Sequence, residues 1–286
     1  MLPEIELAQP KTLPEALAAL AAGDFSPFAG GTNLVIDLRS GREKERKFVS
    51  LGGLEDLKFI RHDQSGVTVG SRTTIANLLD DNEMNTAAPA LVAAADIFAG
   101  SMVRTAGTIG GNICCGSPSA DTVPPLLTLD AQVTLASPAG ERVVALSDFY
   151  LGYKETVLKP GELLVAVSWK PLPENSAHLF YKLARRKGDA ITVTGVSVML
   201  AAKGGKCSEA RIALGSVGPT VFRAEAAEAL LRGKVLTPAL IEQAAKAAAD
   251  QSSPIDDIRA SASYRVQTTH ALVRRLVTQA WQSVSG

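Results

Sequence analysis

The stretch AGTIGGNICCGSPSAD, residues 106–121, places four glycines, two adjacent cysteines, an asparagine and an aspartate within sixteen positions. Glycine has no Cβ, so its backbone can approach a ligand or another chain segment closely. The earlier stretch PFAGGTNL, residues 27–34, also carries a Gly-Gly pair beside a threonine and an asparagine. Backbone amides in such loops can converge on phosphate oxygens. The two stretches, far apart in the chain, therefore predict two glycine loops that hold one diphosphate between them.

We call residues 27–34 the first glycine motif and residues 106–112 the second. Neither has the form of a common nucleotide fingerprint. Gly107, Gly110 and Gly111 lack the GxGxxG spacing of a Rossmann fold, and the chain contains no GxxxxGK[ST] of a P-loop. A single Gly-Gly pair is more often a turn than a ligand loop, so that alternative stays open for each motif alone. The neighbours Cys114 and Cys115 are expected to be small buried side chains.

Composition excludes several classes of function. The 286 residues contain 29 Lys plus Arg and 29 Asp plus Glu, so no basic surface is expected for nucleic acid. The apolar runs are too short to cross a membrane, so no membrane insertion is expected. The N-terminus lacks the features of a cleaved signal, which predicts a cytoplasmic protein. Three cysteines and three isolated histidines, His62, His178 and His270, predict no iron–sulfur cluster or metal site on this chain.

Local patterns predict the elements around the motifs. Thr12 and Glu15 form a capping-box pattern that should begin a helix, and Gly23 should end it. Residues 34–38 fit either a strand or a short helix, and the glycine-rich stretch that follows residue 106 is expected to be a loop. The other expected elements are strands at 48–51, 66–70 and 162–169, helices at 74–79 and 87–99, and a hairpin from 132 to 145 through Pro138 and Gly140.

The pattern changes after Pro171 and Pro173, where we place a domain boundary. Residues 192–202 and 207–217 read as long strands joined by a Gly204-Gly205 hairpin. Three helices are expected after them, at about 223–233, 237–250 and 262–284. The last part of the chain is therefore predicted to be an antiparallel sheet with its helices gathered behind it.

Four stretches together resemble one protein family. They are AGGTNL in the first motif, TIGGNICCGSPSAD from the second, YKLARRKGDAITVTGVSV at 181–198 and RASASYRVQ at 259–267. In order and content they are similar to the FAD-binding medium subunit of the molybdenum hydroxylases, the group that includes xanthine dehydrogenase and carbon monoxide dehydrogenase. The resemblance implies an α+β fold, with two FAD-binding subdomains of the vanillyl-alcohol-oxidase (PCMH) type at 1–55 and 56–173. A C-terminal α+β domain, with an antiparallel sheet and helices, would occupy 174–286.

The resemblance also implies which residues hold FAD. The motifs would grip the diphosphate from two sides, and Asp121 would lie near the sugar chain of the flavin. For Phe98, Leu164 and Lys182 the residues alone leave an alternative open: core packing, a buried strand position and a solvent-facing cation. The implied FAD-binding residues are Pro27, Phe28, Ala29, Gly30, Gly31, Thr32, Asn33, Leu34, Phe98, Thr108, Gly110, Gly111, Asn112, Asp121, Leu164 and Lys182.

By resemblance, the chain would be the electron-transfer subunit of a larger enzyme. A large subunit would carry the molybdenum cofactor and a small one two [2Fe–2S] clusters, in a dimer of heterotrimers. Electrons would pass from the clusters through FAD to an external acceptor, so no catalytic residues are expected on this chain. The sequence specifies neither the substrate nor the acceptor. Two alternatives stay open: a self-contained flavin oxidase or dehydrogenase of the same superfamily, and a non-catalytic nucleotide-binding module.

Overall fold

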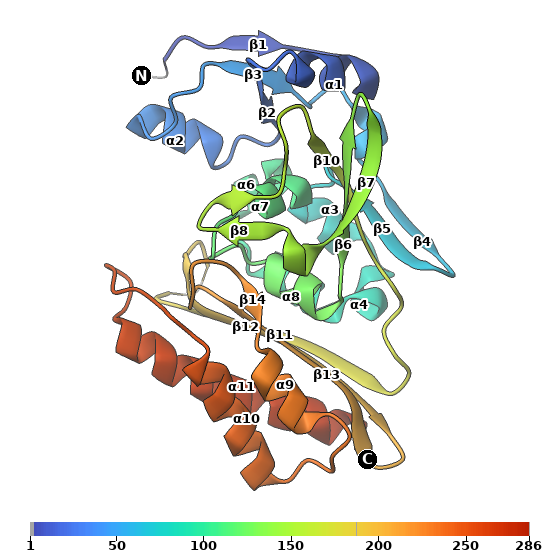
Figure 1. The fold of residues 1–286 in the computed structure, drawn as a ribbon, viewed down its shortest axis with the longest axis vertical. Helices are drawn as coiled ribbons and strands as arrows, with labels where there is room; N and C mark the ends of the chain where they lie inside the picture. The colour runs from blue at the N-terminus through green and yellow to red at the C-terminus, as the bar shows by residue number, and fades with distance from the viewer. Residues whose placement is uncertain (1–2, 187, 286) are drawn as a thin grey trace.

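The computed structural model describes residues 3–186 and 188–285, and Figure 1 shows that its three larger sheets follow one another along the molecule. The first sheet is parallel, in the order β1 (Glu6–Ala8), β3 (Lys47–Ser50) and β2 (Ser26–Phe28). Helix α1 (Leu13–Ala21) packs against it through Ala16, Leu17 and Leu20. The expected helix is confirmed, but Glu15 binds the amide of Lys11 at 2.8 Å instead of that of Thr12.

The middle sheet is antiparallel, and its hairpin between residues 132 and 145 is confirmed. Its strands run in the order β4 (Ile60–Asp63), β5 (Gly66–Gly70), β10 (Leu163–Trp169), β6 (Gln132–Ser137) and β7 (Gly140–Ala145). The helices that accompany it are α3 (Ile75–Asp80), α4 (Met84–Ala87), α5 (Pro89–Asp96), α6 (Ser101–Ala106), α7 (Ile109–Cys114) and α8 (Val123–Thr128). Short elements complete this part: η1 (Glu55–Leu57), η2 (Leu146–Asp148), β8 (Tyr150–Gly152) and β9 (Glu155–Thr156).

Three local expectations need correction or completion. The helix expected over 87–99 is α5, which is shorter because the chain turns after Asp96 and Ala99 takes a positive φ of 40°. Residues 34–38 are helical, within α2 (Leu34–Ser40). The stretch expected to be a loop after residue 106 forms helix α7, because the Thr108 side chain accepts a hydrogen bond from the amide of Gly111 and so caps the first turn.

The C-terminal sheet is antiparallel, as expected, in the order β11 (Ser176–Ala184), β12 (Thr192–Lys203), β13 (Lys206–Gly215) and β14 (Phe222–Arg223). Helices α9 (Glu225–Leu231), α10 (Pro238–Asp250) and α11 (Ala262–Val284) follow it. Strand β12 is buried from Thr192 to Ala202, because α11 covers one side of the sheet while α5 and α8 lie against the other (Figure 1). The sheet thus fixes the position of α8, which lies close behind the second glycine motif in the chain.

Among the residues that the structure describes, no helix combines the length and the apolar character that a membrane crossing requires.

Candidate functional site

The two glycine motifs touch each other. A Cβ on Gly30 would lie only 1.8 Å from the carbonyl oxygen of Ala106 and 3.1 Å from the amide nitrogen of Gly107. No side chain fits in that space, so glycine at position 30 is what allows the loop after β2 to meet the end of α6. The structure therefore brings together the two segments that the sequence analysis placed on one ligand.

The first motif is built as a turn from β2 into α2. Gly31 has a φ of +68°, and a Cβ there would lie 2.8 Å from the ring of Phe28, which itself packs edge-on against Phe48 at 6.2 Å between centroids. The Phe28 ring thus packs between Gly31 and Phe48 and supports the loop. None of the backbone amides of residues 31–34 donates to an acceptor within the described part of the chain. Four adjacent donors at the surface, next to a glycine turn, are suited to an anion.

The second motif differs from what the sequence predicted, because its amides are already used. The amide of Gly110 donates to the carbonyl of Ser71 at 3.0 Å, that of Gly111 to the Thr108 hydroxyl at 3.0 Å, and that of Asn112 to the Thr108 carbonyl at 2.9 Å. Gly110 is also needed for packing, since a Cβ there would lie 2.7 Å from that of Ser71. Gly111 is exposed. This motif therefore offers the exposed backbone at Gly111 and the half-buried side chain of Asn112 instead of a cluster of free amides, because Thr108 is only 7% exposed and its hydroxyl caps α7.

Phe98 joins the two motifs. A Cβ on Gly107 would lie 3.6 Å from the Thr32 hydroxyl and 3.8 Å from the Phe98 ring, so both side chains border the same glycine. Arg104 holds the turn that carries Phe98: its guanidinium donates to the carbonyls of Asp96, Phe98 and Ala99 at 3.1–3.2 Å. Phe98 packs only partly against the middle core, which leaves part of its ring beside the glycines.

The two asparagines of the motifs use different groups of their side-chain amides to bond within the protein. Asn33 donates from Nδ2 to the Cys115 thiol at 3.0 Å, which leaves its Oδ1 without a partner in the described structure. Asn112 accepts at Oδ1 from the Thr122 hydroxyl at 2.7 Å and from the Thr122 amide at 3.4 Å, so that its Nδ2 is the group still available to a ligand. Asn112 therefore keeps its whole side-chain donor group for a ligand, whereas Asn33 uses one donor on Cys115.

Asp121 and Lys182 form a buried ion pair. The Lys182 ammonium donates to Oδ2 of Asp121 at 2.6 Å, and the Thr192 hydroxyl donates to Oδ1 at 2.5 Å. Burial raises the pKa of Asp121, while the ammonium and the hydroxyl act against that shift. Lys182 also reaches the carbonyl of Ile97, beside Phe98, at 3.5 Å. Lys182 is therefore not the solvent-facing cation that the sequence left open.

Comparison with known proteins identifies the family. Residues 3–169 match the FAD binding domain in molybdopterin dehydrogenase, and residues 179–280 match the CO dehydrogenase flavoprotein C-terminal domain. The chain is 31% identical to the carbon monoxide dehydrogenase medium chain of Hydrogenophaga pseudoflava, over 98% of each chain. This chain is an FAD-binding medium subunit of the molybdenum hydroxylase family.

Other relatives agree with this assignment. The xanthine dehydrogenase FAD-binding subunit of Escherichia coli O157:H7 is 31% identical, over 96% of this chain and 95% of its own. A solved carbon monoxide dehydrogenase from Hydrogenophaga pseudoflava, which lacks the Mo-pyranopterin moiety of the molybdenum cofactor, superposes with a TM-score of 0.96 at 32% identity, over 99% of both chains. The quinoline 2-oxidoreductase of Pseudomonas putida 86 superposes with a TM-score of 0.92 at 30% identity, over 100% of both. The expected α+β fold, with an FAD-binding part and a C-terminal domain, is confirmed.

The remaining residues expected at the flavin site differ in how much of each side chain a ligand could reach. Pro27 is the exposed middle residue of β2, and Ala29 and Leu34 are half-buried on either side of the glycine turn. Leu164 is only 2% exposed and belongs to the middle core, so its side chain has almost no surface to offer a ligand. Lys187, within the third stretch of the resemblance, lies outside the described residues.

Several residues of this medium subunit that hold the site in place were not expected from the sequence. They are Ser71, which accepts the Gly110 amide, Arg104 below Phe98, Cys115 against Asn33, and Thr122 and Thr192 around Asp121. Only Thr122 carries a signal: it stands before the Pro124-Pro125 pair at the start of a helix, where its hydroxyl has no amide to cap. Cys115 and Thr192 lie within stretches that carry the family resemblance, but nothing in those stretches indicates what their side chains contact, and no pattern connects Ser71 or Arg104 to the motifs.

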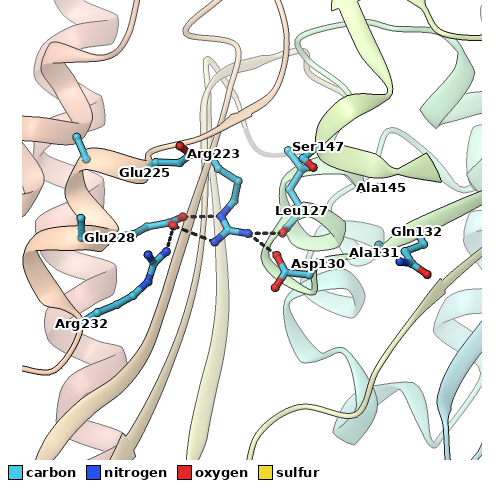
Figure 2. A pocket seen from close by; sticks show the side chains of 12 residues that line it. Leu127, Asp130, Ala131, Gln132, Ala145, Ser147, Arg223, Glu225, Glu228 and Arg232 are labelled. Atoms are coloured by element: carbon cyan, nitrogen blue, oxygen red, sulfur yellow. Dashed lines mark hydrogen bonds and ion pairs between the residues drawn. The ribbon is translucent and has the colours of Figure 1, made fainter.

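A pocket of about 810 Å³ lies away from the motifs, where α9 faces the middle part of the chain. Figure 2 shows Arg223 in this pocket, between Asp130 on one side and Glu228 on the other. Glu228 is fully buried, and it also accepts from Arg232 and from the amide of Ile212. Because these charges pair with one another, we interpret the pocket as part of the interface between the middle part of the chain and the C-terminal domain. None of the residues expected at the flavin lines it.

Proposed function

We propose that this medium subunit carries FAD as an electron-transfer centre, and that it passes electrons from the [2Fe–2S] clusters of a small subunit to an external acceptor. The observation that carries the proposal is the direct contact between the two glycine motifs at Gly30 and Ala106. Together with the bond from Asn33 to Cys115, this contact joins the segment with the unpartnered amides of residues 31–34 to the segment that carries Gly111 and Asn112.

The residues at this junction fit FAD. A diphosphate needs hydrogen-bond donors without a competing carboxylate, and the four amides of the first motif together with Nδ2 of Asn112 meet that need. Gly111 lets a ligand approach α7 closely, because only the Thr108 hydroxyl lies within 4 Å of the space that a Cβ would take. The partly exposed ring of Phe98 offers an aromatic surface beside the glycines. These features support the assignment of the two motifs and Phe98 to the flavin site, whereas the assignment of Asp121 rests on the family resemblance.

Bound FAD would supply the redox chemistry, because flavin can take up electrons one at a time or in pairs. The chain supplies position and electrostatics. Lys182 brings a positive charge that is paired with Asp121 and only 5% exposed, next to the turn that carries Phe98. Because Asp121 neutralises this charge at 2.6 Å, the pair presents a dipole and no net positive charge to its surroundings. Among the described residues, no group of three His, Cys, Asp or Glu side chains is arranged to hold a metal. We assign the metal centres to the partner subunits.

The assembly that follows from this proposal has a large subunit with the molybdenum cofactor and a small subunit with two [2Fe–2S] clusters, in a dimer of heterotrimers within the cytoplasm. In this chain, FAD would lie between subdomains 1–55 and 56–173, and residues 174–286 would form the third domain. Three hydrophobic clusters, around Val49, around Leu126 and around Val198, follow this division only in outline. The first also contains Leu57, Ala136, Leu163 and Val165, and the second also contains Ala213 and Val221.

The test is to co-express the full-length chain with its neighbouring large and small subunits and to measure bound flavin and electron flow. We expect nearly one FAD per medium subunit. We also expect dithionite to bleach the visible flavin band faster in the complex than in the isolated chain in rapid-mixing experiments, because the clusters then deliver electrons to FAD in addition to direct reduction. A colourless chain that added FAD does not restore would support a nucleotide-binding module instead. Turnover of an oxidisable substrate by the isolated chain would support a self-contained oxidase.

A further inference from the structure

Two consecutive residues connect the second glycine motif to the C-terminal sheet. Asp121 and Thr122 lie between α7 and α8, and they are 8% and 0% exposed. Thr122 directs its hydroxyl and its amide to Asn112, while Asp121 receives Lys182 from β11 and Thr192 from β12. A short buried segment is thus bonded on one side to a residue of the motif and on the other side to two strands of another sheet.

The chemistry of α8 explains why Thr122 is available for this role. Thr122 occupies the N-cap position, where a threonine hydroxyl normally accepts from the amide of the second or third residue of the helix. Here those residues are Pro124 and Pro125, which have no amide hydrogen. The hydroxyl makes no capping bond and donates instead to Asn112. Because Oδ1 of Asn112 accepts from Thr122, the Nδ2 group of Asn112 points away from Thr122 and stays available to a ligand.

Thr192 plays the matching part on the other side. Lys182 alone would attract the carboxylate of Asp121 but would not fix its rotation, because an ammonium is a flexible point charge. The Thr192 hydroxyl on the second carboxylate oxygen supplies a second fixed point. With both oxygens held, the backbone at 121–122 cannot shift without breaking a buried charged hydrogen bond, which is costly.

We propose that Thr122 and Thr192 are positioning residues through which the C-terminal sheet sets the orientation of Asn112 toward the ligand of the glycine motifs. This inference rests on the proposed FAD site. It adds that the affinity of that site depends on a hydroxyl of the third sheet, which belongs to a different part of the chain from the motifs.

Strand β12 offers a matched control for Thr192. Thr194 is also buried, at 0% exposure, and its hydroxyl also has a side-chain partner, but that partner is Thr268 of α11. Thr192→Val and Thr194→Val each delete one buried hydroxyl from the same strand with almost no change in shape. A purely structural role predicts similar effects of the two variants on thermal stability and on FAD affinity. A positioning role predicts that only Thr192→Val weakens FAD binding.

The experiment is a titration of the full-length apoprotein with FAD, followed by quenching of flavin fluorescence, with thermal unfolding of each apoprotein measured alongside. We expect the Kd to rise about tenfold in Thr192→Val and in Thr122→Val, as for loss of one well-placed polar contact. Thr194→Val should stay within about twofold of the parent protein, and Thr192→Ser, which keeps the hydroxyl, should restore the parent Kd.

Equal Kd values for Thr192→Val and Thr194→Val would overturn the positioning role while leaving the FAD site intact. So would failure of Thr192→Ser to restore binding when its unfolding midpoint matches that of the parent. If the parent protein itself binds no FAD, the proposed function fails instead, and the two failures are therefore distinguishable.

Discussion

In the first glycine motif the amides of residues 31–34 have no acceptor within the described chain, whereas in the second the amides of Gly110, Gly111 and Asn112 all donate inside the protein. Both segments contain Gly-Gly, threonine and asparagine, yet they use them differently. The first exposes backbone donors at a turn. The second packs closely on Ser71 and on the first motif, and offers the exposed backbone at Gly111 and the half-buried side chain of Asn112. A glycine pair can thus serve either ligand binding or chain packing, and only the structure separates the two.

The strongest way to break this arrangement is Gly30→Ala. The added methyl would overlap the carbonyl oxygen of Ala106, and a backbone carbonyl cannot move aside as a flexible side chain can. We expect a loss of about 3 kcal/mol in the free energy of unfolding, at the upper end for overpacking, together with loss of FAD. Chemical denaturation and the flavin content of the purified protein measure both effects.

Gly100→Ala is the matched control, because Gly100 has a negative φ of −92° and a Cβ there would meet nothing within 4 Å. It should lower the free energy of unfolding by no more than about 1 kcal/mol, the cost of alanine in place of glycine at the N-cap of α6, and leave flavin content unchanged. A stable, yellow Gly30→Ala protein would show that the two motifs do not need to touch.

A smaller set of changes separates the two glycines of the second motif. Gly111→Asp places a carboxylate at the exposed surface of α7, where we expect the diphosphate, so the FAD Kd should rise at least about a hundredfold with little change in stability. Gly110→Ala should instead change stability more than FAD binding. Its methyl would press on Ser71 and lower the free energy of unfolding by about 1–2 kcal/mol. The FAD Kd should then change much less than in Gly111→Asp.

Both variants are measured by FAD titration and by thermal unfolding of the apoprotein. If Gly111→Asp retains stoichiometric flavin, the second motif does not face the ligand, and the assignment of Thr108 and Asn112 must be abandoned with it. If Gly110→Ala is as stable as the parent, close packing on Ser71 is not what glycine provides at that position.

The sequence predicted the overall architecture because each sheet carries its own pattern. The hairpin turn at Gly204-Gly205 and the long apolar run of β12 were enough to expect the C-terminal sheet. The family resemblance supplied the flavin residues in advance of any geometry. What sequence could not supply is the state of each polar group, since that depends on neighbours distant in the chain. The glycine-rich segment after residue 106 reads as a loop, but the Thr108 cap makes it helical and uses its amides.

Asp121 and Lys182 illustrate the same limit. Each was expected near the flavin by motif alone, 61 positions apart, and nothing in either stretch indicates that they form an ion pair. Pairing arises because β11 packs beside α5 and α8, which is a property of the whole fold. The partners of buried polar groups are therefore the part of the site that required the structure.

The smallest expected effect concerns the reactivity of the three cysteine thiols, of which Cys114 and Cys115 follow the second motif and Cys207 lies in β13. Burial raises the pKa of Cys114 to about 12, with the neighbouring Cys115 adding to the shift, and burial raises that of Cys207 to about 11. The thiolate is the reactive form, so at pH 8 the thiolate fraction is about one in ten thousand for Cys114 and about one in a thousand for Cys207. A one-unit rise in pH increases each fraction tenfold and still leaves it small.

Cys115 is the thiol that should react with iodoacetamide: it is half-buried and lies against Asn33 of the first motif, whereas the equally half-buried Cys114 stays protonated because of its raised pKa. We expect mass spectrometry to find modification at Cys115 in the apoprotein at pH 8, and FAD to slow it several-fold by covering Asn33. A Cys115→Ser protein should remain unmodified until it is unfolded. Labelling of Cys115 at the same rate with and without FAD would mean that the ligand does not cover this side of the first motif. The unpartnered backbone amides of residues 31–34 would then have to bind the diphosphate without help from the Asn33 side chain. The two motifs would differ only in whether their backbone amides are available to the ligand.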